Sequence, residues 1–125
     1  MGVILKVRRE LAEGVLAYSK DAHPREVILL LKGSRNKDII VEEVIIPPFA
    51  VHGKGFSQFN PSMIPFDLSM LGVVHSHPSG VLEPSVYDIN HFYGSIMMIT
   101  AYPYLSERDI AIFDRKGQEI PFRVV

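Results

Sequence analysis

The chain has 125 residues, of which 47% are hydrophobic and 22% are charged, with a formal net charge of −1 and no cysteine. These values indicate one globular domain over residues 1–125 and exclude a disordered chain and a disulfide framework. No basic patch suggests a nucleic-acid surface, and no apolar stretch approaches the roughly 20 residues of a membrane span. We therefore expect a cytoplasmic protein with no nucleic-acid or membrane partner.

The first half of the chain predicts one helix followed by two strands. Apolar residues recur at near-helical spacing over 10–22, and a proline two residues later ends the helix. The five apolar residues at 27–31 predict a buried strand, although a short buried helix fits the same run. A polar turn over 33–38 then leads to a β-branched strand over 39–46, which two prolines stop.

The second half of the chain predicts short strands and one further helix. Residues 52–65 read as loop with a short strand at 56–59, and 71–74 form a buried strand that delivers the next residue, His75, at its end. A helix follows over 85–94, because Ser-x-x-Asp begins it and Gly-Ser ends it.

The last thirty residues predict strands only. A strand over 96–102 is followed by a terminal hairpin, in which 110–113 and 120–125 flank a turn. The resulting expectation is an α+β fold in one domain, with a central mixed or antiparallel β-sheet flanked by helices.

His75 and His77, which are separated by one residue, are candidate metal ligands. Alternate residues of a strand point to the same face, so the pair can aim both rings at one point. Asp88, in the first turn of the predicted helix, can add a carboxylate oxygen there. Two imidazoles, one carboxylate and an open position describe a catalytic zinc site, in which zinc lowers the pKa of its water to about 7. A thiolate zinc site is excluded because the chain has no cysteine.

Such a site also needs a base and a hydrogen-bond donor for the oxyanion. Glu83 is close in sequence, but Glu26 is the better candidate base, because apolar surface at the mouth of a buried strand would raise its pKa. Ser85 could donate a hydrogen bond to the oxyanion. The structural alternatives are that Ser85 and Asp88 simply cap the helix and that Glu26 is a solvated charge.

The joint pattern resembles the motif of a known family. His75-Ser76-His77-Pro78, followed by Ser85-Val86-Tyr87-Asp88, is similar to the JAMM (MPN-plus) motif His-x-His-Pro-x6-Ser-x-x-Asp, and Glu26 matches the upstream glutamate of that family. The resemblance implies the JAMM/MPN, cytidine-deaminase-like form of an α+β fold. It also implies one zinc ion per chain held by the two histidines and Asp88, with Glu26 as general acid/base and Ser85 stabilising the oxyanion.

The same resemblance implies a zinc metalloprotease of the deubiquitinase-like isopeptidase kind. The small size of the chain is similar to that of the minimal archaeal and bacterial members, which act on ubiquitin-like modifiers or sulfur-carrier proteins. The expected partner is therefore the C-terminal tail of such a protein and its conjugates. A homodimer is a further expectation, because small domains with exposed edge strands often dimerise.

Two other classes of protein fit parts of the pattern. A non-catalytic scaffold of the same fold is one, but such members have usually lost metal ligands and this set is intact. A cupin-type metal enzyme is the other, because His75 and His77 are followed by Glu83. A cupin needs a further histidine on a later strand, and the only later one, His91, lies in the predicted helix.

Two further histidines and one loop are weaker candidates for the site. His52 lies in the predicted loop and could contact a substrate, and His91 could orient a ligand from one turn after Asp88. The segment 52–62 could accept an extended peptide tail by strand addition.

Overall fold

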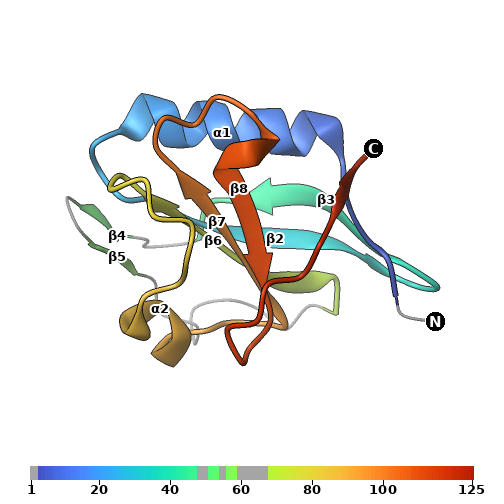
Figure 1. Ribbon diagram of the computed structural model, residues 1–125. Helices are drawn as coiled ribbons and strands as arrows, with labels where there is room; N and C mark the ends of the chain where they lie inside the picture. The colour runs from blue at the N-terminus through green and yellow to red at the C-terminus, as the bar shows by residue number, and fades with distance from the viewer. Residues whose placement is uncertain (1–2, 48–50, 54–55, 59–67) are drawn as a thin grey trace.

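A seven-stranded mixed sheet forms the centre of the computed structural model, which describes residues 3–47, 51–53, 56–58 and 68–125 (Figure 1). Helix α1 lies on one side of this sheet and the short helix α2 on the other (Figure 1). The described elements are, in chain order, β1 (Leu5–Val7), α1 (Arg9–Ala22), β2 (Ile28–Arg35), β3 (Ile39–Ile45), β4 (Val51–Gly53), β5 (Phe56–Gln58), β6 (Met70–His77), α2 (Val86–Asn90), β7 (Ile96–Ala101), the 3-10 turn η2 (Glu107–Asp109), β8 (Ile110–Phe113) and β9 (Arg123–Val124).

The strand order across the sheet is β8-β7-β6-β2-β3-β1-β9. β6 is an interior strand that runs antiparallel to β2 and parallel to β7, with Ile28 of β2 opposite His75. β1 runs parallel to both β3 and β9, whereas β4 and β5 form a separate antiparallel pair. The prediction of an α+β fold with a mixed sheet and flanking helices is therefore confirmed.

The two faces of the sheet carry separate cores. Val74 belongs to the core under α1, and its neighbour Val73 belongs to the core on the α2 side. Alternate strand residues face opposite sides. His75 and His77 therefore face the α2 side, while Ser76 faces α1.

Helix α1 packs on the sheet through one stripe of side chains. Leu11, Val15 and Ser19 recur every four residues and are buried, whereas Gly14 is exposed and leaves the helix unbroken. Burial of one such aliphatic side chain stabilises the fold by about 1.5–3 kcal/mol, which fixes the helix although no side chain caps its start. Within the described residues, no helix combines the length and the apolar character that crossing a membrane requires.

The predicted turn over 33–38 is wrong in its first half. β2 continues to Arg35 and pairs with β3, with a register shift between Lys32 and Gly33. A side chain at Gly33 would overlap the carbonyl oxygen of Ile40 on β3. This glycine therefore marks a bulge where two strands approach closely, and not a turn. The two strands predicted on either side of the turn are confirmed.

The second helix is shorter than predicted. α2 ends at Asn90, and His91 forms its C-cap. Phe92 and Tyr93, whose spacing predicts a further helical turn, instead pack half-buried against the core on the α2 side. Gly94 then adopts a φ of +80°, a conformation that favours glycine, and leads the chain into β7.

The predicted terminal hairpin forms only next to its turn. Phe113 pairs with Glu119, and the Ile120 N–H donates to the Ile112 carbonyl oxygen. The chain then crosses to the other edge of the sheet, where β9 pairs with β1. The three residues of β1 form too short a pattern to be predicted.

Candidate metal centre

The two histidines project from the middle of the sheet. β6 extends three residues beyond its predicted end, so His75 and His77 are both strand residues. Side chains two apart on a strand share a face, as the motif requires. His75 is only 1% exposed and His77 9% exposed, because β2 and β7 flank β6 on both sides.

Helix α2 brings in the carboxylate of Asp88. The Asp88 N–H donates to the Ser85 hydroxyl at 3.0 Å, and the Ser85 N–H donates to Asp88 Oδ2 at 2.8 Å, which together form a capping box. Both residues therefore do cap the helix, as the structural alternative states. Asp88 is nevertheless 2% exposed, and its Oδ1 lies 3.9 Å from Nδ1 of His75. Capping and metal ligation are compatible, because the cap fixes the carboxylate beside the histidines.

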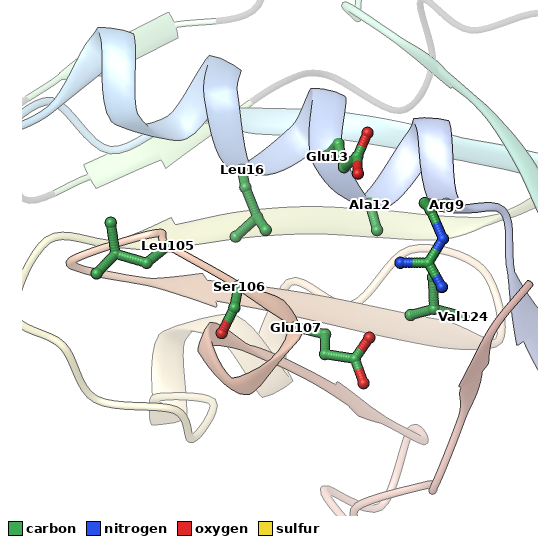
Figure 2. Close-up of a pocket in the computed structure, with 8 residues that line it drawn as sticks. All are labelled: Arg9, Ala12, Glu13, Leu16, Leu105, Ser106, Glu107 and Val124. Atoms are coloured by element: carbon green, nitrogen blue, oxygen red, sulfur yellow. The ribbon is translucent and has the colours of Figure 1, made fainter.

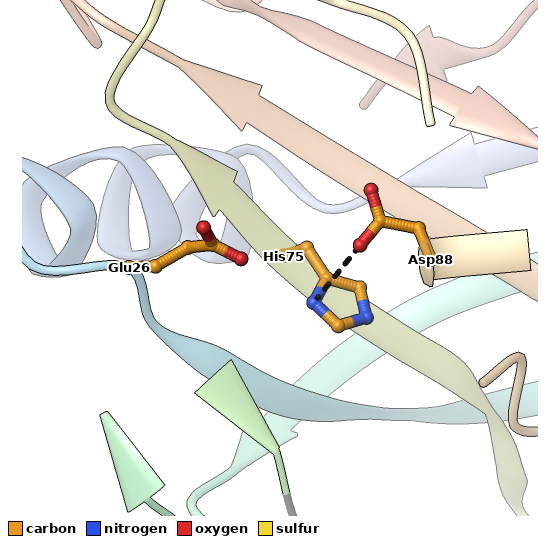
Figure 3. Close-up of side chains that lie close together, drawn as sticks. All are labelled: Glu26, His75 and Asp88. Atoms are coloured by element: carbon orange, nitrogen blue, oxygen red, sulfur yellow. Dashed lines mark ion pairs between the residues drawn. The ribbon is translucent and has the colours of Figure 1, made fainter. Parts of the chain in front are cut away.

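Glu26 reaches the same point from a distant part of the sequence. It lies just before β2, which is antiparallel to β6 in a register that pairs Ile28 with His75. One ligand atom each from Glu26, His75 and Asp88 lies within 4.8 Å of the others (Figure 3). Glu83, in contrast, is exposed and is not part of this group. The geometry therefore favours Glu26 as the carboxylate that serves the site.

His77 is held at both ring nitrogens. Its Nδ1–H donates to the Val81 carbonyl oxygen at 2.8 Å, and its Nε2 lies 3.0 Å from Asp88 Oδ2. An imidazole nitrogen and a carboxylate oxygen at this distance need a positive charge between them, either a proton or a metal ion. A backbone carbonyl that orients one nitrogen is typical of metal-bound histidine. Val81 thus helps to orient the His77 ring. The sequence does not predict this role, because Val81 acts through its backbone carbonyl and not through its side chain.

Burial and hydrogen bonding set the protonation states of the candidate ligands. Burial lowers the pKa of the His75 imidazole to about 4, so this ring is neutral at pH 7. Burial raises the pKa of the Asp88 carboxyl, but the hydrogen bond with His77 and the nearby His75 lower it to about 2. A neutral imidazole and an ionised carboxylate are the forms that bind metal.

The pKa values of His77 and Glu26 are both raised above their ordinary values. Burial lowers the pKa of His77, but the hydrogen bonds to Asp88 and to the Val81 carbonyl raise it above its ordinary value. Burial raises the pKa of Glu26, while the neighbouring His77 acts against this rise. A carboxyl with a raised pKa is better matched to proton transfer near neutral pH than an ordinary one.

The donor set fits a zinc ion. Both ring nitrogens of His75 are buried and have no hydrogen-bond partner among the described residues, although buried polar atoms are almost always paired. A metal ion bound to one of them would supply the partner that this nitrogen lacks. The edge of a tetrahedron with zinc–nitrogen distances of 2.0–2.1 Å is about 3.3 Å. Asp88 Oδ2 lies 3.0 Å from His77 Nε2 and Asp88 Oδ1 lies 3.9 Å from His75 Nδ1, so each histidine has one carboxylate oxygen at a distance close to that length.

Of the two weaker candidates, only His91 has a side chain that the structure describes. The ring of His91 stacks on Tyr87 at 4.0 Å, and its Nδ1 lies 2.9 Å from the Tyr87 carbonyl oxygen, so these two contacts hold it to its own helix and not to a predicted ligand. The backbone of His52 lies in β4, but its side chain is outside the described residues. The strand predicted at 56–59 appears as β5. The rest of the predicted loop, residues 59–65, lies outside the described residues. The strand-addition role of 52–62 stays a prediction, because part of that segment is also outside them.

A pocket of about 230 Å³ lies apart from the metal centre (Figure 2). Leu16 of α1 lines it from above in the view of Figure 2, Leu105 lies at one end, and Arg9 and Val124 lie at the other. It is on the α1 side of the sheet, whereas the histidines face the α2 side. The pocket therefore contributes nothing to the candidate metal centre.

The order and spacing of these groups agree with one protein family. The family described as prokaryotic homologs of the JAB domain matches residues 8–116, a range that contains the histidines, both carboxylates and Ser85. The chain belongs to this family. The resemblance that the motif predicts is thereby confirmed, and most of the JAB-domain chain is covered by the match.

Relatives of this JAB-domain chain extend the same finding. A protein of Haloferax volcanii named "Probable metalloprotease" is 28% identical over 123 residues, covering 92% of this chain and 76% of that protein. A crystal structure of a JAB1/MPN domain protein from Archaeoglobus fulgidus matches with a TM-score of 0.74 and 34% identity, covering 96% of this chain and 98% of the other.

A further solved structure concerns the metal itself. It is described as a JAMM metalloprotease-like zinc site in the proteasome and signalosome, and it matches with a TM-score of 0.73 and 32% identity over 98% of this chain and 99% of the other. A solution structure from Desulfitobacterium hafniense, with a TM-score of 0.58 and 19% identity over 97% and 92% of the two chains, supports the fold alone. Together with the donor set, these likenesses identify zinc as the cofactor of a JAMM-type metalloprotease centre.

Proposed function

We propose that this chain is a zinc-dependent isopeptidase or protease that hydrolyses the bond after the C-terminal tail of a ubiquitin-like modifier or a sulfur-carrier protein. The observation that carries the proposal is the meeting of Glu26, His75 and Asp88 within 4.8 Å, with His77 in contact with Asp88. These residues come from three segments and have the donor chemistry of a hydrolytic zinc site. The choice of substrate rests on likeness to small members of the family.

Each residue has a separate task in the proposed reaction. His75, His77 and Asp88 would hold the zinc ion, which, when bound, polarises the scissile carbonyl and activates water at neutral pH. Glu26 would accept a proton from that water and pass it to the leaving amine, a transfer for which its raised pKa is suited. A group that both takes and returns the proton must lie beside the ligands, as Glu26 does.

Ser85 would stabilise the negative charge that develops on the carbonyl oxygen. Its hydroxyl oxygen accepts the Asp88 N–H in the helix cap, and a hydroxyl that accepts still has its own proton to donate. The side chain is exposed, so a substrate carbonyl can approach it. The cap would then hold the donor in place before the substrate binds.

The test is cleavage of a defined substrate with controlled metal. The probe is a ubiquitin-like protein from the source organism, joined through its C-terminal tail to a fluorescent reporter protein. We expect the purified chain to release the reporter, a chelator to stop the reaction, and added Zn²⁺ to restore it. A chain that binds zinc but leaves every ubiquitin-like fusion and lysine-linked conjugate intact would contradict the proposal and favour the scaffold alternative.

A further inference from the structure

Ser76, the residue between the two histidines, lies on the opposite face of the sheet from them. It is fully buried at 0% exposure. Its partner across the β6–β7 ladder is Thr100, whose hydroxyl lies 2.8 Å from that of Ser19 on α1. Ser76 therefore faces the core under α1, on the side of the sheet away from the histidine side chains.

Ser76 is bonded to Val27 through two hydrogen bonds. The Val27 N–H donates to the Ser76 hydroxyl oxygen at 2.8 Å, and the Ser76 N–H donates to the Val27 carbonyl oxygen at 3.1 Å. Val27 is itself 0% exposed and lies between Glu26 and the start of β2, outside the regular strand. A side chain thus replaces the backbone acceptor that a regular ladder would offer to this N–H.

The hydroxyl of Ser76 is a strong constraint on the backbone at this point. A buried N–H without an acceptor is strongly unfavourable, so we expect the chain at Val27 to move if the hydroxyl is removed. Glu26 is the adjacent residue, and adjacent Cα atoms are about 3.8 Å apart. A shift at Val27 is therefore transmitted directly to the base of the Glu26 side chain.

We infer that Ser76 is a positioning residue that holds the Glu26 carboxylate in register with the zinc ligands. One strand then performs both tasks: the histidines face the metal, and the serine between them fixes the distant segment that carries the base. This role rests on the proposed function, because it concerns a carboxylate assigned to proton transfer. It requires an oxygen at the β-carbon, which serine and threonine have and alanine lacks.

The experiment compares three variants in the reporter-release assay. Ser76→Ala removes the hydroxyl, and we expect kcat to fall about 10- to 100-fold, because misplacement by about 1 Å can cost about 100-fold in rate. KM and the zinc content should stay within twofold of the unchanged protein. Ser76→Thr restores the oxygen and should recover at least part of the lost kcat.

The matched control is Ser19→Ala. Ser19 is also 0% exposed, and its hydroxyl also makes buried hydrogen bonds, one to the Val15 carbonyl oxygen and one with Thr100. It lies on the same side of the sheet, but its hydroxyl bonds to Val15 and Thr100 and not to Val27 or Glu26. We expect a comparable loss of thermal stability and an unchanged kcat.

Several outcomes would overturn the inference. They are a normal kcat in Ser76→Ala, an equal loss of kcat in Ser19→Ala, and a Ser76→Thr variant as slow as Ser76→Ala. If Ser76→Ala does not fold, Ser76→Cys takes its place, because its sulfur fills similar space but accepts only weak hydrogen bonds.

A second readout separates this inference from the proposed function. Crystal structures of the zinc-loaded unchanged protein and of Ser76→Ala should differ in the position of the Glu26 carboxylate by about 1 Å or more, with His75 and His77 in place. If the unchanged protein cleaves no fusion, the proposed function fails, and this comparison alone decides the role of Ser76. A Glu26 carboxylate that stays in place overturns the inference, whatever the protein hydrolyses.

Discussion

At the scale of single residues, the geometry raises a choice between Glu26 and His77 as the third zinc ligand. One ligand atom each of Glu26, His75 and Asp88 lies within 4.8 Å of the others. His77 is not part of that group and reaches it through the contact of its Nε2 with Asp88. The two assignments predict opposite metal contents. If Glu26 moves protons and His77 holds the metal, then Glu26→Gln keeps zinc and His77→Ala loses it.

We expect Glu26→Gln to lower kcat by about 100- to 10,000-fold, because glutamine has the same shape but cannot carry the proton. Zinc per chain, measured by atomic absorption after dialysis, should stay unchanged in this variant and fall strongly in His77→Ala. The reverse pattern, with zinc lost only from Glu26→Gln, would make Glu26 the ligand and His77 the auxiliary group.

Ser85 has two roles that substitutions can separate. Ser85→Ala removes both the cap and the hydroxyl, which should cost about 1 kcal/mol of unfolding free energy. Ser85→Gly costs only a few tenths of a kcal/mol at an N-cap, although it removes the same hydroxyl. If the hydroxyl stabilises the oxyanion, both variants should lose about 100- to 1,000-fold in kcat despite their different stabilities. A kcat that followed stability instead would leave Ser85 with capping alone.

The parts of the site that the sequence predicts are those that depend on local geometry. The side chains of His75 and His77 share a face because they are two apart on a strand, and Asp88 caps a helix because it follows Ser85 by three. The link from Ser76 to Val27 depends on the antiparallel pairing of β2 with β6 and on a break just before β2. No spacing along the chain contains that information.

At the scale of elements, two glycines in regular structure should respond in opposite directions to substitution by alanine. Gly14 is exposed in α1, and an added β-carbon meets nothing within 4 Å. Gly14→Ala should raise the unfolding free energy by about 1 kcal/mol and the melting temperature by about 4 °C. A β-carbon on Gly72 of β6 would overlap the carbonyl oxygen of Ile96 on β7.

Gly72→Ala should therefore lower the unfolding free energy by about 1–3 kcal/mol, since the strand that carries the histidines must move away from β7. Thermal melting monitored by circular dichroism measures both changes. Zinc content reports whether the movement reaches the ligands. An equally stable Gly72→Ala would show that β6 and β7 can separate at no cost, contrary to the close contact in the structure.

Elements with a strong pattern are predictable from sequence, and elements defined by their partners are not. α1 has a stripe of buried residues every four positions, and β3 has a β-branched run, so both are predicted. β9 has two residues and exists because β1 lies beside it, at the far edge from β8. The prediction pairs residues 120–125 with β8 because the two segments are close in sequence. In the structure this pairing ends at Ile120, and the chain continues to β1.

At the scale of the whole molecule, the metal centre joins segments that are far apart in the sequence. Glu26 precedes β2, the histidines end β6, and Asp88 lies in α2. The unfolded chain has no such arrangement, so we expect zinc to bind the folded state selectively and to stabilise it. Stability should therefore report metal binding even when no substrate is known.

We expect a chelator to lower the melting temperature of the protein and added Zn²⁺ to restore it. Selective binding at a free zinc concentration 100 times the dissociation constant contributes about 2.7 kcal/mol, or about 10 °C for a chain of this size. Asp88→Asn is the matched variant, because asparagine keeps an oxygen that can accept the Ser85 N–H but has no charge for the metal. Its folded state should persist while its zinc-dependent shift falls to a small fraction of that of the unchanged protein. If zinc raised the melting temperature of Asp88→Asn as much as that of the unchanged protein, the stabilising zinc would bind elsewhere on the molecule. The packing of the sheet, and not the metal, would then hold the three segments together.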